Sequence, residues 1–214
     1  MKRYIQVSIV VFILVHLPVT AEKIRQLTWD NLVPANLLAE DPIAKLSRDQ
    51  QEMVYWVIDM LESLPKKSPQ NKEDYKELDA AMPTLKKAGI DIEKVMAKRK
   101  EIRTAIVEKL DGTRIRIPGY LLPLEVSDTK VTEFLLVPYV GACIHVPPPP
   151  PNQIIYVKTG PKNGYKSKDI FDPVWVTGTL SIKSRTKDLF LVDGSKGINI
   201  GYGMQADRIE AYEE

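Results

Sequence analysis

Hydrophobic side chains recur at helical spacing in the first half of the chain. In the clearest run the apolar positions are three or four residues apart, and they are Met53, Val54, Val57, Ile58, Leu61 and Leu64. This spacing places them on one face of a helix, which we expect over residues 48–63, capped by Ser47 and ended by Pro65. Weaker periodicity predicts a short helix near 75–82 and another over 91–104.

From Thr104 onward the pattern is that of strands and turns. Residues 114–117 and 174–182 alternate between polar and apolar side chains, as strands with one covered face do. Residues 134–137 and 154–157 are unbroken apolar runs, which are expected where a strand is covered on both faces. Short strands at this density favour a small closed barrel of the OB type, and a β-sandwich is the alternative.

These patterns together predict an α+β protein. We expect residues 22–103 to form a helical N-terminal region and residues 104–214 to form an OB-like antiparallel β-barrel domain on which the helices pack. The dipeptide Asp193-Gly194, between two apolar segments, predicts a hairpin near the end of the chain.

The first 21 residues have the pattern of a secretory signal. Lys2 and Arg3 precede an uncharged run, residues 4–21, that ends in Val-Thr-Ala. Small residues at those positions suit signal peptidase, so we expect residues 1–21 to be a signal peptide cleaved after Ala21. The mature protein would then lie outside the cytoplasm with no membrane span. An uncleaved anchor is the alternative, because a run of this length approaches that of a membrane helix.

Charge and composition exclude several classes of protein. Without Lys2 and Arg3, the 30 basic residues fall to 28, equal to the 28 acidic ones, and no concentrated basic face is available for nucleic acid. His16 lies in the signal, so the remaining chain has one cysteine, Cys143, and one histidine, His145. A disulfide framework, a Cys-rich zinc module and a two-histidine metal motif are therefore excluded within one chain.

Cys143 and His145 are two residues apart and are followed by five prolines, Pro147–Pro151. Residues two apart on an extended segment face the same way, and the prolines favour a stiff polyproline II conformation. Three interpretations remain open. The pair binds a soft or borderline metal, zinc or copper; His145 activates Cys143 as a nucleophile; or Cys143 is a buried apolar residue and His145 a hydrogen-bonded turn residue.

Two protein ligands leave a zinc site incomplete, so the metal interpretation needs further ligands. Four side chains of suitable chemistry stand elsewhere in the chain, although spacing singles out none of them: Met204, Glu125, Asp172 and Asn152. The thiol interpretation lacks a resolving cysteine and an identifiable third group.

Several segments resemble the signatures of a bacterial envelope family, the domain-of-unknown-function family 3299. These segments are Trp29–Pro34, Leu110–Glu125, Leu136–His145 with the prolines that follow, and Pro173–Leu180. The resemblance implies a Gram-negative envelope protein, secreted or lipid-anchored, with no established activity. It also implies an accessory role beside envelope transport or metal-homeostasis systems. This chain lacks a cysteine near its N-terminus for lipid attachment.

We therefore expect an exported periplasmic accessory or binding protein that holds zinc or copper through Cys143 and His145. Its expected partner is an envelope transporter or another periplasmic protein, and nucleic acid is not expected. A thiol-dependent enzyme that uses the same two residues, and a purely structural interaction module, are the alternatives.

Overall fold

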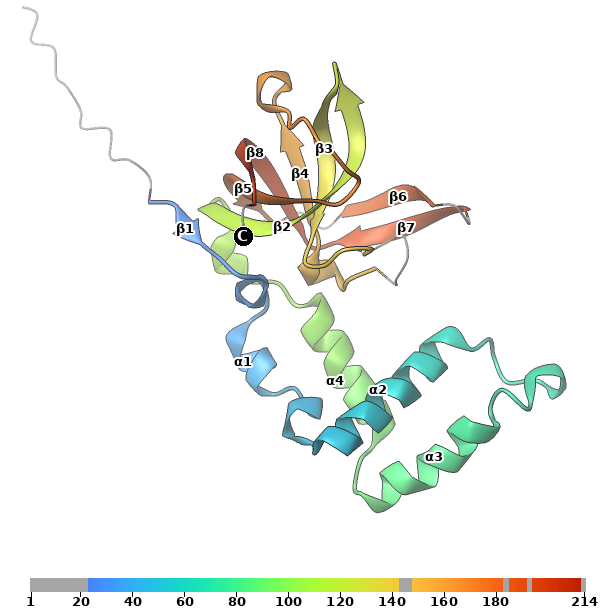
Figure 1. Cartoon of the computed structure of the whole chain (residues 1–214). Coiled ribbons are helices and arrows are strands. Elements are labelled where there is room, and N and C mark those ends of the chain that lie inside the picture. Colours follow the sequence, from blue (N-terminus) through green and yellow to red (C-terminus); the bar gives the residue numbers. More distant parts are fainter. Residues whose placement is uncertain (1–22, 143–147, 183–184, 192–193, 213–214) are drawn as a thin grey trace, which may run out of the picture.

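The computed structural model describes residues 23–142, 148–182, 185–191 and 194–212. Within these ranges, a group of helices lies beside one end of a β-barrel (Figure 1). The α-helices are α1 (Ala35–Ala39), α2 (Arg48–Ser63), α3 (Lys76–Lys87) and α4 (Ile92–Thr104). The strands are β1 (Arg25–Gln26), β2 (Arg114–Ser127), β3 (Lys130–Val137), β4 (Ile155–Thr159), β5 (Asp172–Ser181), β6 (Arg185–Leu191), β7 (Gly194–Ile200) and β8 (Tyr202–Ala211).

Five strands close into a barrel in the order β2-β3-β4-β8-β5, and β5 pairs back onto β2. Four of the five seams are antiparallel, whereas β4 and β8 run parallel because β8 returns to the barrel after a crossover. The predicted α+β fold with a small barrel is confirmed, and closure excludes the β-sandwich. The barrel is mixed and not purely antiparallel as predicted, because β4 and β8 pair in parallel. The short strand β1 adds to β2 in parallel at the edge of the barrel.

The barrel strands β3 and β4 bury both of their faces, which explains their unbroken apolar runs. One face points into the barrel core, where Phe134, Leu136, Ile155 and Val157 are fully buried. The other face contributes to a second apolar layer, here called the outer core, which comprises Leu122, Leu135, Val137, Ala142, Ile154, Tyr156, Ile198 and Ile200. Alternation of side chains along a strand thus fills two cores from the same segments.

The predicted hairpin near the end of the chain forms, but it lies outside the barrel. Among the residues that the structure describes, β6 and β7 pair only with each other, from Arg185 opposite Ile200 to Leu191 opposite Gly194. Ile198 and Ile200 of β7 pack into the outer core. Ile198 and Ile200 thus pack against the outward-facing side chains of β2, β3 and β4, while the hairpin extends beside the barrel and the following strand, β8, closes it (Figure 1).

The helices α2, α3 and α4 enclose a core of their own, built from Ile43, Val54, Val57, Ile58, Leu78, Leu85, Ile90, Ile92 and Val95. Helix α2 has the predicted bounds, and the Ser47 side chain accepts a hydrogen bond from the Gln50 amide at its start. Helix α4 begins as expected after Asp91, whose carboxylate accepts from the Lys94 amide. Helix α3 continues past Pro83 to Lys87 and is longer than predicted. In the ranges that the structure describes, no helix has the length and apolar character to cross a membrane.

Candidate functional site

The predicted pair, Cys143 and His145, lies outside the residues that the structure describes, as do residues 143–147 as a whole. The chain on the near side of the pair is firmly placed. Ala142 is fully buried in the outer core, and Gly141 before it has φ +81°, a left-handed conformation that suits glycine. The chain thus leaves β3 through a sharp turn and enters the Cys-x-His segment from an apolar layer.

The chain on the far side of the pair is equally fixed. Pro149 is buried, and Pro150 has the polyproline II angles φ −61° and ψ 155°. A 3-10 turn, Pro151–Gln153, follows, and the carbonyl of Pro151 accepts a hydrogen bond of 2.8 Å from the Gly201 amide. The described part of the proline run is therefore a packed brace between the barrel and the segment that carries the pair.

Asn152 connects this brace to the end of helix α4. Its side-chain amide donates to the carbonyls of Ile102 at 2.6 Å and Ala105 at 2.8 Å. The last carbonyls of a helix have no partner within the helix, so this amide satisfies two of them and fixes the helix end against the barrel. Sequence analysis named Asn152 without finding this role, because spacing does not show which backbone groups a polar side chain will meet.

Three further hydrogen bonds hold the segment Trp29–Leu32, here called the lead-in, onto the barrel. Gln153 donates from its side chain to the carbonyl of Trp29 at 3.0 Å, and the Trp29 indole donates to the carbonyl of Pro118 at 2.9 Å. The fully buried Tyr202 donates its hydroxyl to the carbonyl of Leu32 and accepts from the Val107 amide, both at 2.7 Å. The lead-in, helix α4 and the proline brace are therefore joined by buried side-chain hydrogen bonds.

Burial shapes the acid–base behaviour of Tyr202. Its enclosure among apolar side chains raises the pKa of the phenol above the usual value of 10.0, and the amide of Val107 partly offsets this by favouring the phenolate. The hydroxyl therefore remains protonated and available as a donor throughout the neutral pH range.

The structure separates the four side chains considered as further metal ligands. Met204 belongs to the barrel core, and the Asp172 carboxylate is already bound by the Ser167 hydroxyl and the Lys168 amide. Glu125 is exposed near the turn between β2 and β3. Asn152 is different, because its side-chain oxygen is buried and accepts no hydrogen bond from the described residues. The described residues hold no group of three or more His, Cys, Asp or Glu side chains that could bind a metal ion.

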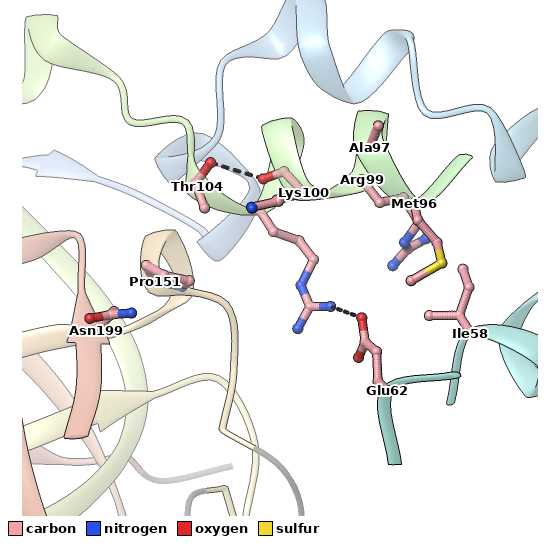
Figure 2. A pocket seen from close by; sticks show the side chains of 10 residues that line it. Ile58, Glu62, Met96, Ala97, Arg99, Lys100, Thr104, Pro151 and Asn199 are labelled. Carbon is pink, nitrogen blue, oxygen red and sulfur yellow. Dashed lines mark hydrogen bonds and ion pairs between the residues drawn. The ribbon is translucent and has the colours of Figure 1, made fainter. Parts of the chain in front are cut away.

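A pocket of about 420 Å³, here called the junction pocket, lies between the helices and the barrel (Figure 2). Helices α2 and α4 form most of its wall, and the barrel side adds Pro151 of the brace and Asn199 of β7. Arg103 of α4 and Glu62 of α2 both line the pocket and form an ion pair there, with 3.6 Å between the nearest guanidinium nitrogen and carboxylate oxygen. Sequence analysis did not find this pocket, because its walls come from segments about 140 residues apart in the chain.

The fold defines a class: a helical region joined to a small closed five-stranded barrel, with an additional hairpin that packs on the outside of the barrel. Residues 29–211 match the family described as "Protein of unknown function (DUF3299)", and the chain belongs to this family. A DUF3299 family protein from Pseudomonas aeruginosa PAO1, known from a crystal structure, is 32% identical to it. The match covers 90% of this chain and 98% of that chain, with a TM-score of 0.50. None of the curated proteins matches the chain.

Proposed function

We propose that this family member is an exported accessory or binding protein that holds zinc or copper through Cys143 and His145. The anchoring on either side of the pair carries this proposal. Ala142 is fixed in the outer core, and Asn152 is hydrogen-bonded to helix α4. Both ends of the segment that bears the two ligands are thus held in place, and restricted freedom favours a preorganised metal site.

The unpartnered oxygen of Asn152 supports the same proposal. A metal-bound histidine usually donates its other ring N–H to a nearby acceptor, which fixes its orientation and tautomer. Asn152 supplies a buried acceptor a few residues beyond His145. The remaining coordination positions would be filled by water or by a partner, an envelope transporter or another periplasmic protein.

The metal hypothesis is tested by titrating the mature chain, residues 22–214, with zinc and copper(I) against a chromophoric competitor. We expect tight binding of one metal by the wild type and none by the double variant Cys143→Ala, His145→Ala. The matched control is Glu93→Gln, an exposed carboxylate of α4, which should bind as the wild type does. Equal binding by the wild type and the double variant would contradict the proposal.

The thiol alternative is distinguished by alkylation of the folded, metal-free protein. An activated Cys143 would react unusually fast near neutral pH, and the single variant His145→Ala would slow the reaction. Fast alkylation combined with no metal binding would replace the proposed function by thiol chemistry.

Export is tested separately by mass spectrometry of the protein from fractionated cells. We expect a chain that starts at Glu22 in the periplasmic fraction. A chain that retains residues 1–21 in the membrane fraction would indicate an uncleaved anchor instead.

A further inference from the structure

The junction pocket is distinct from the residues that the proposed metal site uses, and its lining points to a ligand of its own. It lies where α2 and α4 meet the barrel, beside Pro151 and Asn199 (Figure 2). Its volume of about 420 Å³ falls in the range of small-molecule sites. A molecule bound there would touch both the helical region and the barrel.

The charged side chains of the pocket are mostly basic. Helix α4 contributes Arg99, Lys100 and Arg103, which the helical repeat brings to one side, and α2 contributes a single carboxylate, Glu62. Three cations against one anion give this wall a surplus positive charge of two, although the mature chain as a whole is neutral. Cations near a helix C-terminus also stabilise the helix, but such an effect does not require them to line a cavity.

The three cations differ in how firmly they are bound by the protein. Arg99 is held by Asp41, 3.6 Å away, and lies over the ring of Tyr55. Arg103 pairs with Glu62, but both side chains are partly exposed to solvent, and such ion pairs are weak. The Lys100 ammonium makes no ion pair or hydrogen bond with the part of the chain that the structure describes. Lys100 and Arg103 are therefore the two cations that an incoming anion can bind.

Besides the charged residues and the polar Thr104 and Asn199, the lining is apolar. Ile58 of α2, Met96 and Ala97 of α4, and Pro151 of the brace form this part of the wall. A cationic side next to an apolar side matches a ligand that has an acidic head and a hydrocarbon body.

We propose that the junction pocket binds a small amphiphilic anion, a carboxylate or phosphate ester with an apolar body. The acidic head lies between Lys100 and Arg103, which donate charge-assisted hydrogen bonds to it. The body lies against Ile58, Met96 and Pro151.

The test is calorimetric titration of the mature chain with octyl phosphate and with octanoate, both kept below the concentration at which they aggregate. We expect saturable one-to-one binding, and a loss of affinity of about tenfold or more in the double variant Lys100→Gln, Arg103→Gln, because two charge-assisted hydrogen bonds are removed. The matched control is Lys72→Gln, an exposed lysine of the loop before α3, which should bind as the wild type does. A second variant, Ala97→Leu, fills the pocket without removing charge and should also abolish binding.

Octanol, which has the apolar body but no charge, separates the proposal from general hydrophobic binding. If octanol binds as tightly as octyl phosphate, or if the double variant keeps the wild-type affinity, the proposal is overturned. Vesicles of phosphatidylglycerol distinguish the source of the ligand. Binding to vesicles that the double variant loses identifies a lipid, and binding of free octyl phosphate alone identifies a soluble anion.

The Cys143→Ala, His145→Ala variant separates this inference from the proposed function. It should bind octyl phosphate as the wild type does, whether or not the wild type binds metal. Loss of octyl phosphate binding in that variant, with the fold intact by circular dichroism, would contradict the separate pocket.

Discussion

Replacing Tyr202 with phenylalanine removes one oxygen atom and leaves the fully buried ring in place. That oxygen donates to the carbonyl of Leu32 and accepts from the amide of Val107, both at 2.7 Å. The two backbone groups lie 170 and 95 residues from Tyr202 in the chain, so one hydroxyl ties the lead-in and the segment after α4 to strand β8.

The expected cost follows from the burial of the groups that lose their partner. A hydrogen bond contributes about 1 kcal/mol net, and a buried backbone group left without a partner costs about 1–3 kcal/mol. Leu32 is fully buried and Val107 partly buried. We therefore expect Tyr202→Phe to lower the free energy of unfolding by about 2–4 kcal/mol, a large share of the stability of an ordinary domain.

Urea denaturation of residues 22–214, followed by circular dichroism, measures this change. The midpoint should fall while the slope with denaturant stays constant, because the same surface is exposed on unfolding. Tyr55→Phe is the matched control, because Tyr55 is exposed and its hydroxyl accepts a long hydrogen bond of 3.4 Å from Arg99. We expect this control variant to change the free energy of unfolding by less than about 0.5 kcal/mol. If Tyr202→Phe also stays within that limit, the Tyr202 hydroxyl does not hold the lead-in on the barrel.

Three further predictions follow from the same geometry. The free energy of unfolding should fall as the pH rises above about 10, because Tyr202 ionises there in the unfolded chain while burial raises its pKa in the folded state. In urea melts, Tyr202→Phe should make the free energy of unfolding less dependent on pH in this range. Gly178→Ala should lower the free energy of unfolding by about 2 kcal/mol or more, because an added Cβ would lie 2.4 Å from a backbone oxygen of β8. Gly160 has open space around it, so Gly160→Ala should leave the thermal melt nearly unchanged. Asn152→Ala should cost about 2 kcal/mol and speed amide hydrogen exchange in the last turn of α4, and exposed Asn163→Ala should do neither.

The elements of this fold were largely predictable, because local spacing determines them. Helix α2 follows directly from its apolar positions between Ser47 and Pro65. The continuous apolar runs in β3 and β4 correctly indicated strands covered on both faces. The spacing of apolar residues shows that a strand face is buried, but it does not show which other element packs on that face. An alternating pattern predicts a strand with one buried face. The sequence of β7 does not show, however, that Ile198 and Ile200 pack against the outside of the barrel.

The residues of the candidate sites also differ in how far the sequence alone can identify them. Cys143 and His145 stand out in the sequence because residues 22–214 contain no other cysteine or histidine. The hydrogen bonds of Asn152 and Tyr202, in contrast, reach partners that are distant in the chain. Such contacts depend on how complete elements pack, so residue type and spacing do not reveal them.

The hairpin β6–β7 has a consequence for how the molecule opens. Among the described residues it pairs with no barrel strand, and Ile198 and Ile200 of β7 pack into the outer core. Its detachment would therefore remove this apolar packing while the backbone hydrogen bonds between the barrel strands stay in place. The hairpin and the barrel are expected to behave as two cooperative units with different opening free energies, and native-state hydrogen exchange should show β6 and β7 exchanging well before β3 and β4. Each such opening would expose to solvent the apolar layer from which the chain leaves Ala142 toward Cys143.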